Sequence, residues 1–307
     1  MIIVSNHENQ LCNRLFALSP VLAYCAEHNQ SLMLLFFCSK YSSLFPDFHK
    51  YIRSVFETDN AGKNVMSRRL NKLVAILRGK SGDEVYYDSV NSGVYGVPTS
   101  MLDGSERLLT FVNSWKSRFD DRFVAKHKDV IRRCFAPQPD VLEYVDKTIN
   151  SIRKENDGCK IVGIHIRRGD YKIWREAKYY YDFSFYHDVM QEVVHQNVGE
   201  KIFFVITSNE TVPPECTDGF SFFYNSESSG ICDLYLLSKC DYIAGPPSTY
   251  SQWASFYGDV PLKLLCGEKN EFNLTNDFSE IDTYRKFRNG KQLIDLDGVN
   301  FVVKDIS

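Results

Sequence analysis

The sequence lacks the features that mark several classes of protein. Its longest apolar run, Leu32 to Cys38, is far too short to cross a bilayer. The first residues carry neither the basic leader nor the long apolar segment of a secretory signal. The nine cysteines are scattered without a C-x-x-C pair, which argues against a disulfide framework and against a zinc site. The net charge is only -3, so nothing global suggests nucleic-acid binding. We therefore expect a cytoplasmic protein of bacterial type.

What the sequence does contain is an alternation of strands and helices in both halves. A strand, a helix and a second strand are predicted within residues 2–37, which is a β-α-β start. From residue 160 onward, strands and helices alternate again with short connections. The pattern predicts an α/β protein of two Rossmann-like, doubly wound domains that face a cleft, at residues 1–150 and 151–307.

One stretch in the second half has the pattern of an anion-binding site. The apolar run Ile161 to Ile164 predicts a buried strand, and His165, Arg167, Arg168 and Asp170 follow it. In open α/β sheets, ligands bind just beyond the carboxyl ends of the strands. Two adjacent arginines at such a place suit a phosphate or diphosphate, which they can hold by paired hydrogen bonds. The alternative is a surface loop whose arginines face water.

The turn at residues 6–10 is a second expected site. It follows the first predicted strand and precedes the first predicted helix. The carboxyl end of a strand and the N-terminus of a helix both favour ligand binding.

Three segments together carry a resemblance to a known family. Residues 165–170, His-Ile-Arg-Arg-Gly-Asp, look like an H-x-R-R-x-D motif. Residues 9–17, with Asn-Gln-Leu and then Arg-Leu-Phe-Ala, look like an N-terminal G-N-Q-L-F signature. Residues 233–254 resemble a third motif, in which a D-L-x-L-M-S-x-C helix leads to an S-T-F-S-W-W loop. The chain thus resembles the α-1,2-fucosyltransferases of glycosyltransferase family 11, with kinship to the protein O-fucosyltransferases and the α-1,6 enzymes. The resemblance implies a GT-B fold, with an N-terminal acceptor-side domain, a C-terminal GDP-sugar-binding domain and GDP-fucose as the donor.

The sequence departs from the family pattern at several positions. His7 and Glu8 replace the usual glycines of the first motif, Pro246-Pro247 stands where an Asn is common, and Gln252 stands where a Trp is common. These changes leave the donor side largely intact, but they leave the acceptor and the linkage open.

The resemblance assigns donor roles to the residues around the two arginines. Arg167 would be the main phosphate clamp, and Arg168 would be secondary or structural. Asp170 would orient the arginines or act as a local turn acceptor. His165 would contact the nucleotide or be a core histidine with satisfied hydrogen bonds.

Further donor contacts are expected from two other segments. Guanine offers N–H donors that a carboxylate accepts, and the candidates are Asp233 and the strand end Ser208-Asn209-Glu210. Four residues, Ser248, Thr249, Tyr250 and Ser251, open a predicted helix, where hydroxyl and N–H groups can contact an anion. Helix capping alone is the alternative for these residues.

Inversion at the sugar needs a base that takes the proton of the acceptor hydroxyl. Glu8 and His7, at the end of the first predicted strand, are the candidates for this role. Asn9 and Arg14 could position the donor or the acceptor.

No metal ion is expected, because two arginines on a diphosphate remove the need for Mg²⁺. The only D-x-D sequence, Asp295-Leu-Asp297, lies in a tail that is polar from Asn270 onward and that we expect to be irregular, although Phe301 to Val303 could add an edge strand. We interpret this D-x-D as part of the surface. The alternative is a metal-dependent transferase that uses Asp295 and Asp297.

The predicted activity is an inverting transfer of fucose from GDP-fucose to O2 of a galactoside, on a glycan or lipid-linked glycan acceptor. A basic amphipathic segment at residues 63–80 could lie on the anionic inner membrane, or it could be a solvated helix face. The alternative function is that of a catalytically silent sugar-nucleotide-binding or scaffold protein, which the altered first motif favours.

Overall fold

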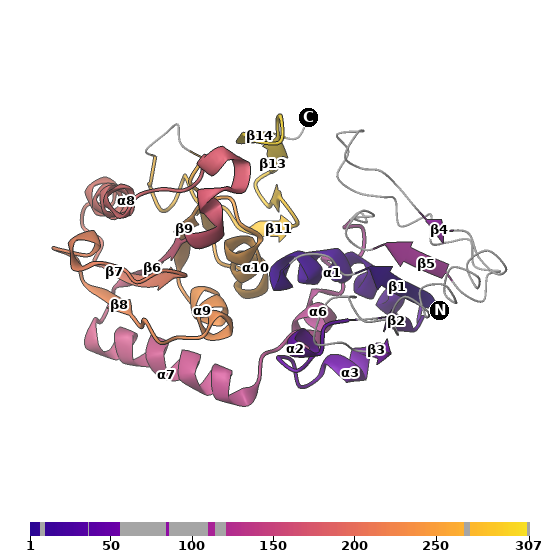
Figure 1. Cartoon of the computed structure of the whole chain (residues 1–307). Coiled ribbons are helices and arrows are strands. Elements are labelled where there is room, and N and C mark those ends of the chain that lie inside the picture. Colours follow the sequence, from indigo (N-terminus) through magenta and orange to yellow (C-terminus); the bar gives the residue numbers. More distant parts are fainter. Residues whose placement is uncertain are drawn as a thin grey trace. The chain divides into compact units, whose positions relative to one another are not determined.

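The computed structural model describes residues 1–6, 10–35, 37–55, 84–85, 110–113, 121–266 and 271–305. By its contacts the chain divides into two compact units, Met1–Gln138 and Pro139–Ser307 (Figure 1). The domain ranges expected from the sequence, 1–150 and 151–307, assign most of the helix that starts at Pro139 to the first domain. The contacts assign that helix to the second unit.

Unit 1 is built around a sheet of five parallel strands in the order β3-β2-β1-β5-β4. The strands are β1 Ile2–Asn6, β2 Leu32–Leu35, β3 Ile52–Val55, β4 Glu84–Val85 and β5 Thr110–Asn113. The helices among the described residues of this unit are α1 Leu11–Glu27, α2 Ser39–Ser42, α3 Phe48–Tyr51 and α6 Lys128–Cys134. The predicted β-α-β start is confirmed, because Leu15, Leu18 and Leu22 of α1 are buried and β1 pairs with β2 in parallel.

Unit 2 contains a second sheet of five parallel strands, in the order β10-β9-β6-β7-β8. The strands are β6 Lys160–Ile166, β7 Ile202–Ser208, β8 Phe222–Tyr224, β9 Tyr242–Gly245 and β10 Leu262–Leu264. The helices are α7 Pro139–Glu155, α8 Phe183–Gln196, α9 Gly230–Leu237 and α10 Thr249–Gly258. Helices α7 and α9 cover one face of the sheet and α8 covers the other (Figure 1). The strand order reverses between β6 and β9, which is the place where doubly wound sheets bind ligands.

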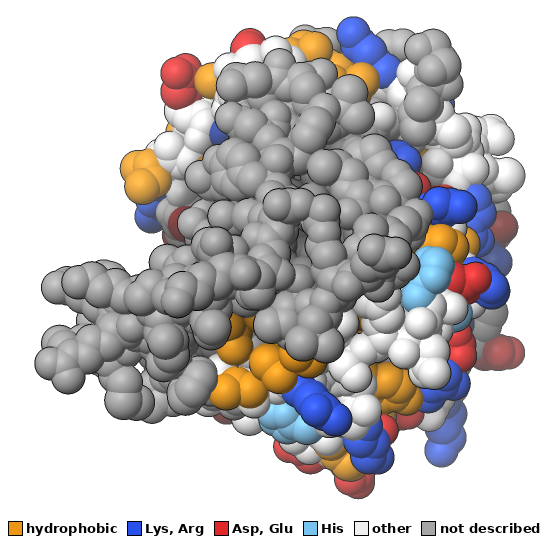
Figure 2. Space-filling view, turned by 90° about the vertical axis from the view of Figure 1, so that its right-hand side faces the viewer, with side chains coloured by type: hydrophobic (Ala, Val, Ile, Leu, Met, Phe, Trp, Pro, Cys, Tyr) orange, Lys and Arg blue, Asp and Glu red, His pale blue; other side chains and the backbone are white. Residues whose placement is uncertain are grey.

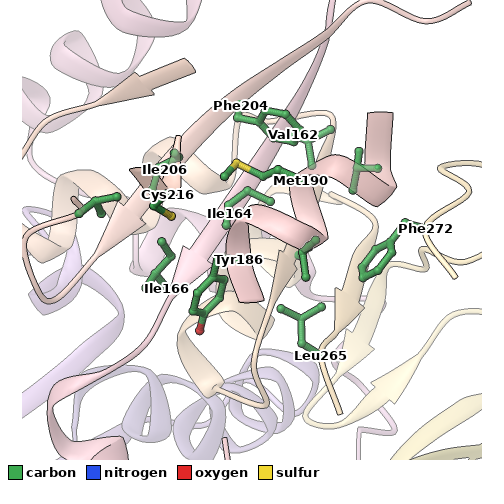
Figure 3. Close-up of a cluster of buried hydrophobic side chains, with 14 of the residues drawn as sticks. Val162, Ile164, Ile166, Tyr186, Met190, Phe204, Ile206, Cys216, Leu265 and Phe272 are labelled. Atoms are coloured by element: carbon green, nitrogen blue, oxygen red, sulfur yellow. The ribbon is translucent and has the colours of Figure 1, made fainter. Parts of the chain in front are cut away.

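Strand β6 lies in the middle of this sheet and is buried on both faces. Figure 3 shows Val162, Ile164 and Ile166 of β6 packed with Phe204 and Ile206 of β7, and with Tyr186 and Met190 of α8. The three β6 side chains are fully buried. A strand that carries apolar side chains on both faces is typical of parallel sheets covered by helices. The core therefore fixes the carboxyl end of β6 within the fold.

The C-terminal part of unit 2 forms a sheet of its own, so the expectation of an irregular tail is wrong except at Phe301 to Val303, where the expected edge strand is confirmed. Four short antiparallel strands follow one another in the order of the chain. They are β11 Ile281–Thr283, β12 Lys286–Phe287, β13 Lys291–Asp295 and β14 Phe301–Asp305. Ile281, Phe287, Leu293 and Phe301 are the buried side chains that hold this sheet against the rest of the unit.

No described helix is both long enough and apolar enough to span a membrane. In the space-filling view of Figure 2, basic and acidic side chains are interspersed over the described residues. The basic segment 63–80 lies outside the described residues.

Candidate functional site

A pocket of about 470 Å³ lies in unit 2 at the carboxyl ends of β6 and β7. This volume is within the usual range of small-molecule sites. Most of its lining side chains are polar or charged. The lining residues are His165, Arg167, Thr207, Ser208, Asn209, Glu210, Thr211, Tyr224, Ser226, Ser228, Gly230, Asp233 and Tyr250. Seven of the residues predicted from the sequence as donor contacts line this pocket: His165, Arg167, Ser208, Asn209, Glu210, Asp233 and Tyr250.

Arg167 is the first residue after β6 and lines the pocket. Its Nη2 donates a hydrogen bond to Oδ2 of Asp170 at 2.9 Å, and its guanidinium carbon lies 5.7 Å from the centre of the Tyr171 ring. The Arg167 side chain is 18% exposed and that of Asp170 is 48% exposed, so the ion pair lies at the surface of the loop on the side of Asp170. Of the two roles left open for Asp170, the structure thus shows the contact with Arg167.

Arg168 is directed elsewhere and does not line the pocket. Its Nε donates to Oε2 of Glu210 at 2.8 Å, its Nη1 to the carbonyl of Tyr181 at 2.5 Å and its Nη2 to the hydroxyl of Tyr180 at 2.5 Å. The guanidinium carbon also lies 4.4 Å from the centre of the Phe183 ring. These contacts occupy the guanidinium within the protein. Arg168 was expected to be either a secondary phosphate contact or a structural residue, and the contacts correspond to the structural role.

Asn209 and Glu210, at the end of β7, hold the loop that carries both arginines. Oδ1 of Asn209 accepts the backbone N–H of Arg168 at 2.8 Å. Oε1 of Glu210 accepts the N–H of Gly169 at 3.0 Å, and the same oxygen lies 3.3 Å from Nζ of Lys172. The hydrogen bond from Arg168 is the main cause that lowers the pKa of Glu210.

Gly169 shows why a glycine follows the two arginines. Its φ is +48°, a conformation that residues with side chains adopt at a cost. A Cβ at this position would lie 2.5 Å from Nδ2 of Asn209. The sequence suggested the end of β7 as an acceptor for guanine N–H groups. The structure instead engages both oxygens of Glu210 in holding the loop, and no sequence signal links Glu210 to residues about forty positions earlier.

His165 and Thr207 present buried polar atoms to the pocket. They are paired across β6 and β7, and their exposed fractions are 4% and 1%. Among the described residues, neither Nδ1 of His165 nor the hydroxyl of Thr207 has a hydrogen-bond partner. Leaving such a group unsatisfied costs about 1–3 kcal/mol, so we expect a water molecule or a ligand to complete these bonds. Thr207 is a residue that the sequence reasoning missed.

The imidazole of His165 is neutral at physiological pH. Burial, followed by the positive charge of Arg167, lowers its pKa to about 3. The ring lies 4.9 Å from the ring of Tyr250, with the two planes inclined by 30°. On the other side, a Cβ at Gly245 of β9 would come within 2.9 Å of Cβ of His165, so the glycine makes room for the imidazole.

Asp233 lies in the first turn of α9 and faces the same pocket. Burial raises the pKa of its carboxyl group to about 6, so most of it is ionised at neutral pH. Tyr250, from α10, donates its hydroxyl hydrogen to the carbonyl of Gly230 at 2.6 Å. This bond links the beginning of α10 to the beginning of α9. Both bonded residues line the pocket, together with His165 and Asp233.

The serine loop before α10 is a helix cap in this structure. Oγ of Ser248 accepts the N–H of Tyr250 at 3.2 Å, which is the usual bond of a capping residue. Ser251 is fully buried, and its hydroxyl donates to the carbonyl of Ser248 at 3.2 Å. Ser248, Thr249 and Ser251 do not line the pocket, and only Tyr250 of this loop reaches it.

The four residues expected to serve as base or positioning residues belong to unit 1. His7, Glu8 and Asn9 are outside the described residues. Arg14 belongs to unit 1, where it is buried in α1 with its guanidinium carbon 4.9 Å from the centre of the Tyr41 ring. Burial lowers the pKa of this arginine.

The D-x-D sequence is divided between two roles. Asp295 pairs with Arg175, and only 20% of its side chain is exposed. Reading Asp295 as a surface residue was therefore wrong. Asp297 is the exposed member, and its carboxylate accepts the N–H groups of Val299 and Asn300 at 2.9 Å and 2.7 Å. In the described part of the chain, no group of three or more His, Cys, Asp or Glu side chains is arranged to hold a metal ion.

Comparison with known proteins identifies the kind of enzyme to which this pocket belongs. Residues 109–261 match the model of glycosyl transferase family 11. The matched stretch covers about half of the chain and includes every residue that lines the pocket. The glycosyltransferase class predicted from the three motifs is therefore confirmed. No curated protein sequence matches the chain.

Solved structures of fucosyltransferases have a similar fold. A mutant of Arabidopsis thaliana FUT1 in complex with GDP aligns with a TM-score of 0.57 and 11% identity, over 99% of this chain and 83% of that chain. The NodZ α-1,6-fucosyltransferase soaked with GDP-fucose aligns with a TM-score of 0.53 and 13% identity, over 86% and 94%. POFUT1 in complex with GDP aligns with a TM-score of 0.50 and 13% identity, over 84% and 94%. The similarity confirms the predicted fold class, with parallel, Rossmann-like sheets of the GT-B kind.

Proposed function

We propose that this glycosyltransferase transfers fucose from GDP-fucose, with inversion, to O2 of a galactoside in a glycan acceptor. The family match supports the reaction class. Similar folds have been solved with GDP or GDP-fucose, which supports the choice of donor. The galactoside and its O2 rest on the sequence resemblance alone.

The observation that carries the proposal is that Arg167 and Asp233 both line one pocket of about 470 Å³. A guanidinium can hold the diphosphate of a GDP-sugar. An ionised carboxylate can accept the N–H donors of guanine. The pocket thus offers opposite charges to the two ends of GDP that need them.

Arg167 would contribute most to the transition state. As fucose departs, its ring acquires oxocarbenium character and negative charge grows on the β-phosphate. A cation that is already in position stabilises this charge without reorganisation at the moment of reaction. Asp170 and Tyr171 hold Arg167 in such a position. We propose that the enzyme acts without a metal ion, because this guanidinium takes the role that Mg²⁺ has in other transferases.

His165 and Thr207 would bind the donor through their unpartnered polar atoms. A neutral imidazole adds a directional hydrogen bond, and it brings no second positive charge beside Arg167. Its low pKa also means that His165 does not take up the proton of the acceptor hydroxyl at physiological pH.

The base and the acceptor contacts would come from unit 1. We propose Glu8, with His7, as the base, and Asn9 and Arg14 as positioning residues. The acceptor would be a glycan or lipid-linked glycan of surface-polysaccharide biosynthesis on the cytoplasmic side of the inner membrane. The basic segment 63–80 would then supply a peripheral contact with anionic lipids.

Binding calorimetry with GDP-fucose, GDP-mannose and a UDP-sugar tests the donor. The proposal expects binding of the GDP-sugars and a loss of that binding in Asp233→Asn. A chain that binds only UDP-sugars would contradict it.

The second candidate is a catalytically silent sugar-nucleotide-binding protein, and the observation that favours it is the replacement of motif glycines by His7 and Glu8. An acceptor panel that includes water separates the two functions. Binding of GDP-fucose without turnover on any acceptor supports the silent protein, whereas release of GDP with any member of the panel supports the enzyme.

A further inference from the structure

The loop that follows β6 is held at two places by different elements. Asn209 and Glu210 hold its beginning, as described above. Its far part is held by the C-terminal antiparallel sheet, through Arg175 and Asp295. Nη1 of Arg175 donates to Oδ1 of Asp295 at 3.0 Å, and Nη2 donates to Oδ2. The two side chains are 11% and 20% exposed, so the pair is largely shielded from water.

The backbone at this point has a conformation that needs support. Arg175, Glu176 and Ala177 have φ values of +51°, +56° and +59°. Consecutive left-handed residues are unfavourable for L-amino acids with a Cβ, so neighbouring contacts must maintain them. Phe301 of β14 supplies two such contacts. Its ring centre lies 3.9 Å from the guanidinium carbon of Arg175, and its N–H donates to the hydroxyl of the buried Tyr179 at 2.5 Å.

A continuous set of contacts leads from this pair to the pocket. The guanidinium carbon of Arg175 lies 5.0 Å from the centre of the Trp174 ring, and that ring lies 4.5 Å from the ring of Tyr171. The Tyr171 ring packs beside the guanidinium of Arg167, and its hydroxyl donates to the carbonyl of Pro247 at 2.7 Å. Displacement of Arg175 would therefore be transmitted through two aromatic rings to Arg167.

We propose that Arg175 and Asp295 are positioning residues of the donor pocket. The C-terminal sheet, through this ion pair, sets the placement of Arg167 and thereby the strength with which the pocket holds a diphosphate. This inference rests on the proposed function of the pocket as a GDP-sugar site. It also gives a role to Asp295 of the D-x-D sequence, although this sequence lies far from Arg167 in the chain.

The variants Asp295→Asn and Arg175→Gln test the proposal, and Asp241→Asn is the matched control. Asp241 also pairs with an arginine, Arg153 at 2.8 Å, and accepts the N–H of Ile161 at the amino end of β6. It therefore acts on the same strand but at the end away from the pocket. Calorimetry with GDP is expected to show a dissociation constant at least tenfold higher than that of the parent for each test variant. The control should lose a similar amount of melting temperature to the test variants. Its dissociation constant should nevertheless stay within twofold of the parent value.

Two further variants separate positioning from general stability. The double variant of Arg175→Gln with Asp295→Asn is expected to bind GDP no more weakly than either single one, because the two residues act as a unit. Arg175→Lys keeps the charge but loses the paired geometry, and it should retain intermediate affinity. It also serves as the test if the other variants do not fold. GDP affinities within twofold of the parent in the folded variants would overturn the proposal.

Hydrogen exchange in the absence of nucleotide gives a readout that does not depend on the proposed function. Amides of residues 167–173 should exchange at least tenfold faster in Asp295→Asn than in the parent, while those of β7 remain unchanged. If the parent protein binds no GDP, the proposed function fails, and the exchange experiment alone decides the inference. Unchanged exchange at residues 167–173 would overturn it in either case.

Discussion

Arg167 and Arg168 are neighbours in the chain, but only Arg167 lines the pocket. The guanidinium of Arg168 is occupied by Glu210, Tyr180 and Tyr181, and the residue is only 9% exposed. One arginine thus lines the pocket, and the other fixes the loop that carries both. The two side chains should therefore respond differently to substitution.

Arg168→Ala should reduce the free energy of unfolding by about 3 kcal/mol, because it leaves Glu210 without its main partner in a largely buried network. Chemical denaturation of the purified protein measures this change. Arg153→Ala is the control, since Arg153 pairs with Asp241 at a more exposed place and should cost no more than about 1 kcal/mol. Equal losses for the two variants would show that the Arg168 network has no special role.

Glu210 should make unfolding sensitive to acid. Its pKa in the folded protein is below its usual value, mainly because of Arg168. A depressed carboxyl pKa adds stability above the pKa of the unfolded chain, and that stability is lost as the pH falls toward the folded value. The difference in unfolding free energy between the parent and Glu210→Gln should thus be largest near neutral pH and shrink below about pH 4. A difference that stays constant with pH would contradict this account of Glu210.

Asp233 should make donor binding depend on pH near 6. Burial raises its pKa to about 6, so protonation removes the carboxylate as the pH falls through this value. The dissociation constant for GDP-fucose, whose diphosphate does not titrate in this range, should rise below pH 6 in the parent. In Asp233→Asn the binding should be weak and independent of pH. His165, with a pKa of about 3, does not contribute to the profile.

The same raised pKa of Asp233 has an opposite effect on stability without ligand. A raised carboxyl pKa costs stability once the pH exceeds the unfolded value, because the folded state disfavours the ionised form. Asp233→Asn should therefore stabilise the empty protein at neutral pH, and this gain should vanish near pH 4 and below. Thermal unfolding at several pH values measures it. A loss of stability at neutral pH would show that the carboxylate has a structural partner.

Thr207→Val should separate stability from affinity. The hydroxyl of Thr207 is buried and has no hydrogen-bond partner among the described residues. Its replacement by a methyl group should leave the unfolding free energy unchanged or raise it by about 1 kcal/mol. Affinity for GDP-fucose should fall by about tenfold, which corresponds to roughly 1.4 kcal/mol. A loss of stability with no change in affinity would mean that the hydroxyl faces protein and not ligand.

The sequence was sufficient to predict the parallel sheets and to place Arg167 at the carboxyl end of a buried strand. Both depend on local patterns. Ile161 to Ile164 form a continuous apolar run, and Arg167 follows that run directly, so a reader of the chain can place an arginine at the end of a buried strand. The alternation of strand and helix then predicts a doubly wound fold.

The remaining features depend on partners that are distant in the chain. Arg168 and Arg167 have the same side chain, and the contact of Arg168 with Glu210, just after the next strand, helps to distinguish their roles. Arg175 and Asp295 are 120 positions apart. The C-terminal sheet, apart from the strand at Phe301 to Val303, escaped prediction because its strands have two to five residues, and each carries only one buried apolar side chain. Such strands are too short for a period to be recognised.

The central claim is that Arg167 stabilises the departing diphosphate of GDP-fucose, and the rate of fucosyl transfer by Arg167→Ala tests it most directly. Arg153→Ala, which changes an arginine of α7 that pairs with Asp241, is the control. The account predicts that kcat for Arg167→Ala falls by about a hundredfold or more, with Arg167→Lys in between and the control near the parent. Transfer by a folded Arg167→Ala protein within twofold of the parent rate would contradict it.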